Sequence, residues 1–271
     1  MIKKEKFEQT PMGKGVVALS RAMDKAGMPP IEINVIGGFA LMMYDDGIRD
    51  PHAITDIDYV GKPFPKKFND LVDAIGDKYD LGSGWINNEN MSSGITMEDY
   101  ELATGELHFN KALEIGNITI NVLDEKDVLK LKLLAVDSSL MGCEAGEPFT
   151  RSKDLPDVSK LLDKFKISCD KIDEQFPECL MFERTAEVIQ AYKDGGLQKA
   201  TELSKEIQKP ILELTRNLKE QKQNQLPSSF LNMSSGSNLL SSMLDSAFKR
   251  AYSESDFDFD DEPKDGQLDD V

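Results

Sequence analysis

The sequence predicts a mixed α/β protein, with a small mixed sheet and flanking helices followed by a helical domain. Short apolar runs with strand character, bounded by turn residues, occupy the chain up to about Asp124. From Glu125 to about Gln225 the strand signals stop and the apolar spacing becomes helical. We therefore expect an α/β domain at 1–124, a helical domain at 125–225, a linker with a short amphipathic helix at 226–250, and a disordered acidic tail at 251–271.

The composition excludes several classes of protein. The 271 residues carry a formal charge of -17, but residues 251–271 hold nine acids against one lysine, so the body is only moderately acidic. Binding to duplex DNA is driven by neutralisation of its phosphates with positive charge. An acidic protein is therefore not expected to bind long duplex DNA. The longest charge-free apolar stretch near the front, Ile33–Tyr44, has twelve residues. A membrane span needs about 20, so no membrane segment is expected.

The start of the chain and the cysteines bear on location. The sequence MIKKEKFEQT is not followed by an apolar segment, so we expect no signal peptide and a cytoplasmic protein. Cys143, Cys169 and Cys179 lack CxxC spacing, which is typical of reduced thiols. The histidines are His52 and His108, too few for a His-based metal cluster. We interpret His52 as a loop residue and His108 as a strand-face residue.

Breakers and apolar spacing define the elements of the first region. A helix is expected over Gly15–Ala26, because Gly27 and two prolines end its periodicity. Ile31–Ile36 is typical of a buried strand, and the Gly37-Gly38 pair separates it from a short helix that begins within Phe39–Tyr44. The later elements are a strand at Asp56–Val60, a helix at Lys66–Tyr79, and strands at Leu107–Phe109, Ala112–Ile115 and Ile118–Leu123, with Gly116-Asn117 as a hairpin turn.

The second region is expected to be helical throughout. The expected helices are Glu125–Val136, Lys153–Phe165, a broken segment within Cys169–Ala191, and Leu197–Gln223 with Pro210 as a candidate kink.

Trp85, in the first region, lies in an expected loop and is interpreted as a core anchor.

Chemistry is concentrated between residues 33 and 60. In a strand, Asp56 and Asp58 point to the same side, with Ile57 and Tyr59 on the other. Two carboxylates a few ångströms apart repel by about 4 kcal/mol at an effective dielectric near 20, so the pair invites a cation. Mg²⁺ takes one or two carboxylates plus substrate phosphates. The Gly37-Gly38 turn would let a phosphate approach backbone N–H groups.

These residues resemble the nucleotidyltransferase superfamily related to DNA polymerase beta. Its signature is a strand, a Gly-Gly or Gly-Ser pair, a helix, and then an Asp-hydrophobic-Asp strand. GGFAL, then Arg49 and TDID, is most similar to the branch that contains AbiEii-type toxins and related prokaryotic proteins. Seventeen residues separate Gly38 from Asp56, so the loop with Pro51 and His52 is a candidate insertion. The sequence LGSGWINN also resembles an element of that branch, and the likeness covers roughly residues 30–160.

Two later segments extend the resemblance. EKDVLKLKLLAVDSS and TRSKDLPDVSKLL are similar to the branch's Lys-x-x-Ala helix and Arg-x-Lys-Asp helix start. Helical geometry places Lys132 on an apolar face, where a lysine must either meet an anion or extend to solvent. The resemblance implies that Lys132 holds phosphate and that Asp154 contributes an acid to the same site, with Arg151 and Lys153 beside it.

The resemblance implies a nucleotidyltransferase that moves a nucleoside monophosphate from a nucleoside triphosphate to a hydroxyl. Asp56 and Asp58 would hold Mg²⁺ or Mn²⁺, and Asp154 is a candidate base. The triphosphate would contact the following residues: Gly37, Gly38, Arg49, Thr55, Lys132, Arg151 and Lys153. The acceptor stays open between an RNA end such as tRNA, a protein side chain and a small molecule. A toxin-like or defence role is implied by the family alone.

One position departs from the family pattern. Superfamily enzymes often draw a third carboxylate from a neighbouring strand, and the matching position here is Asn121. The alternative function is therefore a binding protein of the same fold with weak or no catalysis, acting through its helices and acidic tail. The apolar stripe Leu239–Phe248 would dock on the chain's own helices or bind a protein partner.

Overall fold

The computed structural model describes residues 1–45, 47–51, 54–88, 96–140, 151–177, 179 and 184–225, with side chains as far as residue 209. The chain divides into two compact units, Met1–Asn217 and Leu218–Val271. Of the second unit, the description covers the end of the last helix. The expectations for His52, Cys143, the linker at 226–250 with Leu239–Phe248, and the acidic tail at 251–271 lie outside the described residues.

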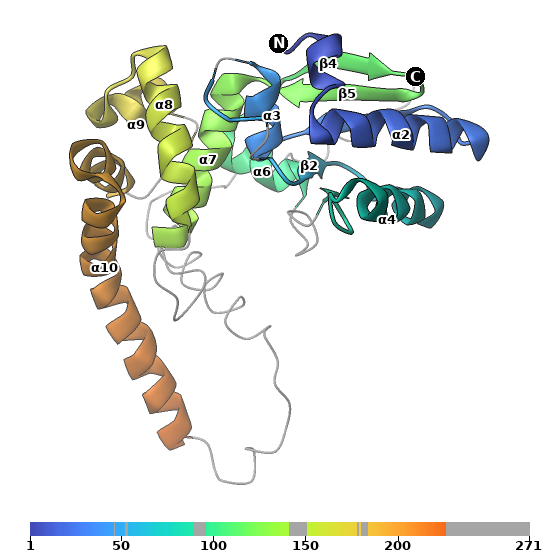
Figure 1. Cartoon of the computed structure of the whole chain (residues 1–271). Helices are drawn as coiled ribbons and strands as arrows, with labels where there is room; N and C mark the ends of the chain where they lie inside the picture. Colours follow the sequence, from blue (N-terminus) through green and yellow to red (C-terminus); the bar gives the residue numbers. More distant parts are fainter. Residues whose placement is uncertain are drawn as a thin grey trace, which may run out of the picture. The chain divides into compact units, whose positions relative to one another are not determined.

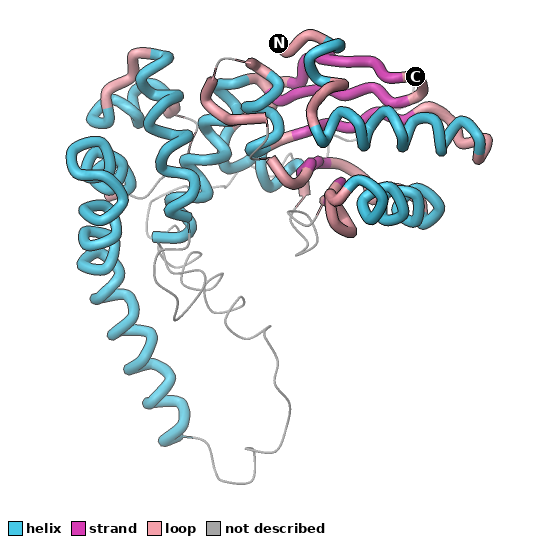
Figure 2. The backbone as a smooth tube through the Cα atoms, viewed as in Figure 1, coloured by secondary structure: helices cyan, strands magenta, loops and turns pink. Residues whose placement is uncertain are grey.

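The first unit contains a mixed sheet with helices packed on it, so the predicted mixed α/β class is confirmed (Figure 2). The sheet is open and has five strands in the order β3-β2-β1-β5-β4. β1 pairs parallel with β5 and antiparallel with β2, β4 pairs antiparallel with β5, and β2 pairs parallel with β3. The strands are β1 Ile31–Val35, β2 Ile57–Val60, β3 Ile86–Asn87, β4 Phe109–Ile115 and β5 Ile118–Leu123.

The hairpin between β4 and β5 corrects one expectation. The sequence suggested separate strands at Leu107–Phe109 and Ala112–Ile115, but β4 is continuous from Phe109. Its register shifts between Lys111 and Leu113, and such a bulge disturbs the alternation that marks a strand in sequence. The predicted turn is confirmed, and Gly116 has a positive φ of 57°. A Cβ at Gly116 would lie 2.2 Å from the Ser20 hydroxyl, so a side chain does not fit there.

Two long helices form the layer beside the sheet. α2 (Pro11–Lys25) and α4 (Lys66–Tyr79) lie side by side and contact each other (Figure 1). α2 begins four residues before the expected start because Thr10 caps it, its hydroxyl accepting from the Gly13 N–H at 2.9 Å. A short helix, α1 (Lys4–Phe7), and the strand β3 had no counterpart in the expectations.

Trp85 is buried between these two helices, as expected of a core anchor. It is 1% exposed, and its indole N–H donates to the Val72 carbonyl at 2.8 Å. Glycines allow this contact, because a Cβ at Gly15 would lie 3.1 Å from the indole ring and one at Gly76 would lie 2.8 Å from it. The Trp85 carbonyl accepts from the Ile57 N–H at 2.7 Å, so the anchor also fixes the start of β2.

The helices after Asp124 confirm the predicted change to helical structure. The elements are α7 Glu125–Leu140, the 3-10 turn η1 Arg151–Asp154, α8 Leu155–Phe165, the 3-10 turn η2 Cys169–Lys171, α9 Ile172–Gln175 and α10 Thr185–Gln225. α7 is one turn longer than expected. α10 breaks at Gly196, where φ is +70°, in the interval 192–196 that the sequence left between two expected helices, and its backbone is helical at the candidate kink Pro210. In the described ranges, no helix is both long and apolar enough to cross a bilayer.

Two short helices complete the region around the cavity described below. α3 (Gly37–Met43) follows β1 directly, and α6 (Met97–Thr104) was not expected. A capping box starts α6: the Thr96 hydroxyl accepts from the Asp99 N–H, and the Asp99 carboxylate accepts from the Thr96 N–H. Cys169 is a free, buried thiol, and burial raises its pKa.

His108 joins the start of β4 to α7. It lies in the segment before β4, so its expected place on a strand face is wrong. Its backbone N–H and ring Nδ1 contact the buried Asp127 carboxylate at 2.8 and 3.0 Å. The hydrogen bond to Asp127 and the charge of that carboxylate raise the His108 pKa, and Glu106 raises it to a smaller extent.

The first prediction concerns Gly76. An Ala at an exposed helix site stabilises by roughly 1 kcal/mol over Gly, but a Cβ at position 76 would lie 2.0 Å from the Gly82 carbonyl oxygen. Gly76→Ala should therefore destabilise the protein by about 2 kcal/mol or more, measured by urea denaturation. The exposed change Asn69→Ala on the same helix should stay within about 0.5 kcal/mol of wild type. A Gly76→Ala protein as stable as wild type would contradict the packing described here.

The second prediction concerns His108, whose pKa should lie above its ordinary value of about 6.5. Its raised folded-state pKa means that its contribution to stability is complete below about pH 6.5 and is lost as the pH rises through the raised value. Titration of the ring protons by NMR should show that Asp127→Asn lowers the pKa more than Glu106→Gln does, because Asp127 is the larger cause. Equal shifts in both variants would contradict this assignment.

Candidate functional site

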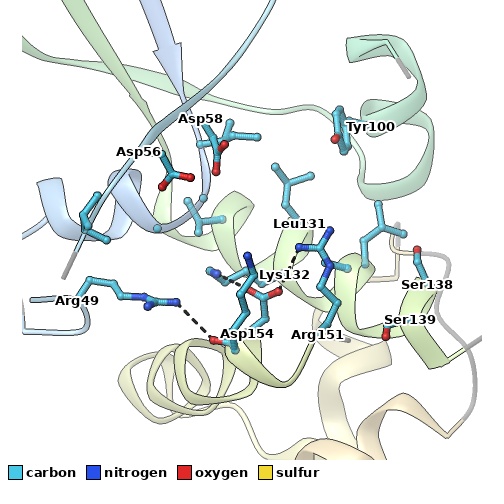
Figure 3. A pocket seen from close by; sticks show the side chains of 18 of the residues that line it. Arg49, Asp56, Asp58, Tyr100, Leu131, Lys132, Ser138, Ser139, Arg151 and Asp154 are labelled. Carbon is cyan, nitrogen blue, oxygen red and sulfur yellow. Dashed lines mark hydrogen bonds and ion pairs between the residues drawn. The ribbon is translucent and has the colours of Figure 1, made fainter. Parts of the chain in front are cut away.

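A cavity of about 610 Å³ opens between the end of β1, the start of β2, α6, α7 and η1 (Figure 3). It is lined by almost every residue that the sequence singled out. These are Gly37, Gly38, Arg49, Thr55, Asp56, Asp58, Lys132, Arg151, Lys153 and Asp154. The segments come from both sides of Asp124, so the fold brings together residues more than 100 positions apart.

The two aspartates stand on the sheet side of the cavity. Asp56 immediately precedes β2 and Asp58 is its second residue, and both carboxylates face the cavity (Figure 3). The predicted alternation is confirmed, because Ile57 and Tyr59 are buried on the other side at 1% and 4% exposure. Among the described residues, no group of three or more His, Cys, Asp or Glu side chains could hold a metal ion. A cation here would take these two carboxylates and complete its shell with ligand oxygens, which suits Mg²⁺.

Gly37 makes room for Asp58. Its φ of +66° lies in the left-handed region, and a Cβ there would stand 3.2 Å from Asp58 Oδ2. The Ile36 N–H donates to the Asp58 carbonyl at 3.0 Å, so the turn after β1 is tied to the acidic strand. A Cβ at Gly38 would meet the Ile54 side chain at an ordinary 3.4 Å. The fold therefore requires glycine at position 37 more strictly than at position 38.

Lys132 does not extend to solvent. It is 6% exposed, and its ammonium contacts Asp154 Oδ1 at 2.6 Å and Asp157 Oδ2 at 2.8 Å. A lysine on an apolar helix face needs an anion, and here the chain itself supplies it as the carboxylates of Asp154 in η1 and Asp157 in α8. Asp157 was missed by the sequence analysis. Its signal was present, because an acid three residues after Asp154 lies on the same side of a helix start.

Arg49 reaches the same carboxylate from the other side. Its Nε and Nη2 donate to Asp157 Oδ2 at 3.0 and 2.5 Å, and Nη2 also donates to the Lys153 carbonyl at 3.4 Å. Lys160 donates to the Ile48 carbonyl at 2.9 Å, so the loop that carries Arg49 is held on α8. Asp157, at 2% exposure, thereby connects this loop to Lys132 on α7.

Asp154 has a second oxygen with hydrogen-bonding capacity left. Asp154 is 5% exposed, and its Oδ2 is buried without a hydrogen-bond partner among the described residues. Arg151 Nη1 is 3.8 Å from this oxygen, too far for a hydrogen bond but close enough for an ion pair. A buried acceptor in this state is suited to receive a hydroxyl or another donor from a ligand. Lys153 is exposed at the rim.

Tyr100 of α6 is a cavity residue that the sequence analysis did not identify. It is half-buried, and burial raises its pKa, with Arg151 lowering and Asp58 raising it by smaller amounts. The phenol is therefore protonated at neutral pH and near both charged walls (Figure 3). The Thr96–Asp99 capping box was the available signal for the helix that carries it.

Asn121 does not line the cavity. Its Nδ2 donates to Asn34 Oδ1 at 3.0 Å, and the two residues are direct partners in the parallel pairing of β1 and β5. The amide of Asn121 is thus engaged with a neighbouring strand rather than with the cavity. Two acids from outside the sheet, Asp99 of α6 and Asp154 of η1, join Asp56 and Asp58 around the cavity.

The third prediction tests the buried ion pairs. Lys132→Met leaves Asp154 and Asp157 without their shared cation and should destabilise the protein by about 3 kcal/mol in urea denaturation at neutral pH. Adding Asp154→Asn removes one of the uncompensated charges and should restore part of this loss. The same change at the exposed Lys153 is the control and should have little effect. Equal losses at the two lysines would contradict the pairing.

The chain was compared with protein-family models, curated proteins and solved structures. No family model matches it, and no curated protein or solved structure is significantly similar. What the cavity can do chemically must therefore be inferred from its own carboxylates, cations and glycine turn.

Proposed function

We propose that the protein is a Mg²⁺-dependent nucleotidyltransferase that moves a nucleoside monophosphate from a nucleoside triphosphate to a hydroxyl acceptor. One observation carries the proposal: a single cavity has two carboxylates on its sheet side and a group of cations on its helical side (Figure 3). A metal-bound triphosphate has the matching distribution of charge, because its cation needs carboxylates and its phosphates need cationic donors.

The acidic side would hold the metal. Asp56 and Asp58 would bind Mg²⁺ or Mn²⁺, which when bound neutralises charge on the phosphates. Gly37 keeps the turn free of a side chain next to Asp58, so phosphate oxygens can approach the backbone there. Thr55 and Gly38, which also line the cavity, lie next to these residues in sequence.

The helical side would hold the phosphates. Arg49, Lys132 and Arg151 face two acids, Asp154 and Asp157, so this group carries one positive charge in excess. Arg49 and Lys132 are oriented by Asp157, which leaves their remaining N–H donors for phosphate oxygens. Arg151 is the most exposed of the three and would contact the triphosphate first, with Lys153 at the rim.

Asp154 is the group best suited to take the acceptor's proton. In the proposed step, the acceptor hydroxyl donates to Asp154 Oδ2, its oxygen attacks the α-phosphorus, and pyrophosphate leaves. The proton passes to the carboxylate as the new phosphoester bond forms and the bond to the leaving phosphate breaks. Lys132 is bonded to Oδ1 of the same carboxylate, which leaves Oδ2 as the oxygen with a hydrogen bond still to accept.

The order of elements supports the proposed class. β1, then α3 with Gly37 and Gly38 as its first two residues, and then the antiparallel strand β2 with its Asp-x-Asp follow in the order expected of the nucleotidyltransferase arrangement. The toxin-like or defence role and the choice among an RNA end, a protein side chain and a small molecule are part of the same proposal and depend on the resemblance.

A second candidate function has its own observation. Asn121 replaces the strand carboxylate that superfamily enzymes often use, and it is engaged with Asn34 rather than with the cavity. A protein that binds a nucleotide without transferring it would need no third carboxylate on the sheet. In that case partners would be recognised through the helical region and the acidic tail.

The fourth prediction tests the transfer reaction. Adding the full chain to a cell extract with Mg²⁺ should increase the transfer of label from α-phosphate-labelled nucleoside triphosphates above that in extract alone, and should not increase the transfer of γ-phosphate label. Asp56→Asn/Asp58→Asn should reduce transfer by roughly 10²-fold or more, because the phosphates lose their metal. Asp70→Asn/Asp77→Asn, two exposed acids of α4, is the matched control and should retain activity.

Two results would count against the proposed reaction. Transfer of α-label that survives the cavity variant would show that these aspartates are not the metal site. Nucleotide binding by calorimetry with no transfer to any component of the extract would favour the binding protein.

A further inference from the structure

One wall of the cavity has a different chemistry from the rest. Partly exposed residues of α7 line it at helical spacing, beginning beside Lys132 and ending at the last turn of the helix. They are Leu131, Leu134, Ala135, Ser138 and Ser139, called here the α7 stripe. The stripe runs about 12 Å along the helix axis, at about 1.5 Å per residue. It is apolar for most of its length and has two hydroxyl side chains at its far end.

The α7 stripe is distinct from the core face of the same helix. Leu133, Val136 and Leu140 are completely buried, and Asp137 bonds to Thr185 of α10 at 2.6 Å. The stripe residues instead retain exposed surface toward the cavity. Part of the apolar surface of α7 is therefore kept out of the core, in contact with a space large enough for a ligand.

An aromatic residue completes this part of the cavity. Tyr100 of α6 lines the same space as the stripe, and Figure 3 shows its ring beside that space, with Leu131 between it and the cations. Burial is the main cause of its raised pKa, so the ring is neutral and partly shielded from water. Its hydroxyl end lies near the charges of Asp58 and Arg151.

The cavity is thus divided by polarity. The carboxylates and cations occupy one part, and an apolar surface with an aromatic ring and hydroxyl groups extends from it. We propose that the α7 stripe and Tyr100 form the subsite for the base and sugar of a nucleoside triphosphate whose phosphates lie at Arg49, Lys132 and Arg151. Heterocyclic bases bind through apolar and aromatic contacts of this kind, and Ser138 offers a donor and an acceptor at the base edge.

The inference rests on the proposed function, and the choice of probes separates the two. Inorganic tripolyphosphate carries the charges of the nucleotide without its base and sugar. Calorimetry on the full chain with Mg²⁺ should show that at least one of the four common ribonucleoside triphosphates binds roughly tenfold or more tightly than tripolyphosphate, because one stacked base contributes about 1–3 kcal/mol.

Two neutral variants of the stripe test its part in that difference. Ala135→Leu fills the subsite and Leu134→Ala removes apolar contact, and neither changes the charge of the cavity. Each should weaken binding of the preferred nucleotide by about tenfold and leave tripolyphosphate affinity unchanged. Ala74→Leu, the same enlargement at an exposed position of α4, should change neither affinity. Thermal unfolding of each variant verifies that it is folded.

The outcomes distinguish the subsite from the reaction. If tripolyphosphate binds as tightly as every nucleotide, or if the stripe variants weaken both probes equally, the subsite is wrong and the proposed phosphate site stands. If neither nucleotides nor tripolyphosphate bind to wild-type protein, the proposed function and the subsite are both overturned.

Discussion

The cavity depends on one carboxylate oxygen, Asp157 Oδ2. It accepts from Arg49, which belongs to the loop after α3, and from Lys132, which belongs to α7. Both cations would otherwise be costly, since a charged group that is removed from water needs a partner. Because Asp157 is itself buried and bonded on both sides, the loop, α7 and α8 are fixed as a group. The α/β part and the first helices of the helical region are thereby joined at the point where the cavity opens.

The same arrangement decides how a polyanion would be received. The cations already have carboxylate partners, so a phosphate would share them with Asp154 and Asp157 rather than meet bare charges. The net attraction is then modest, and a metal ion on Asp56 and Asp58 would be needed to bring the charges of a triphosphate into balance. Specific placement, more than overall charge, is what this cavity offers a ligand, which is consistent with the acidic character of the whole chain.

Local sequence signals predicted much of the fold, and the resemblance to nucleotidyltransferases singled out most of the residues that line the cavity. The helix Lys66–Tyr79 and the strand Ile118–Leu123 have the expected bounds, because amphipathic spacing and turn residues determine them locally. Features that depend on distant contacts were missed: the bulge in β4, the two-residue strand β3, and the roles of Asp157 and Tyr100. Asp157 resembles any acid in the first turn of a helix until the fold brings Arg49 and Lys132 to it. The break of α10 at Gly196 falls in the interval 192–196 that the sequence left between two expected helices, where glycine can adopt the positive φ.

The glycine at position 37 has a consequence for finding relatives of this chain. Gly37 has a left-handed backbone, and a Cβ at this position would lie 3.2 Å from Asp58 Oδ2. The residue at position 37 therefore has to stay small while Asp58 is present. Gly15 and Gly76 stand in the same relation to Trp85. A distant homologue that has lost overall identity should therefore still show three coupled pairings, each between a glycine and one larger residue. Such a pattern can be sought in sequences that are too divergent to align.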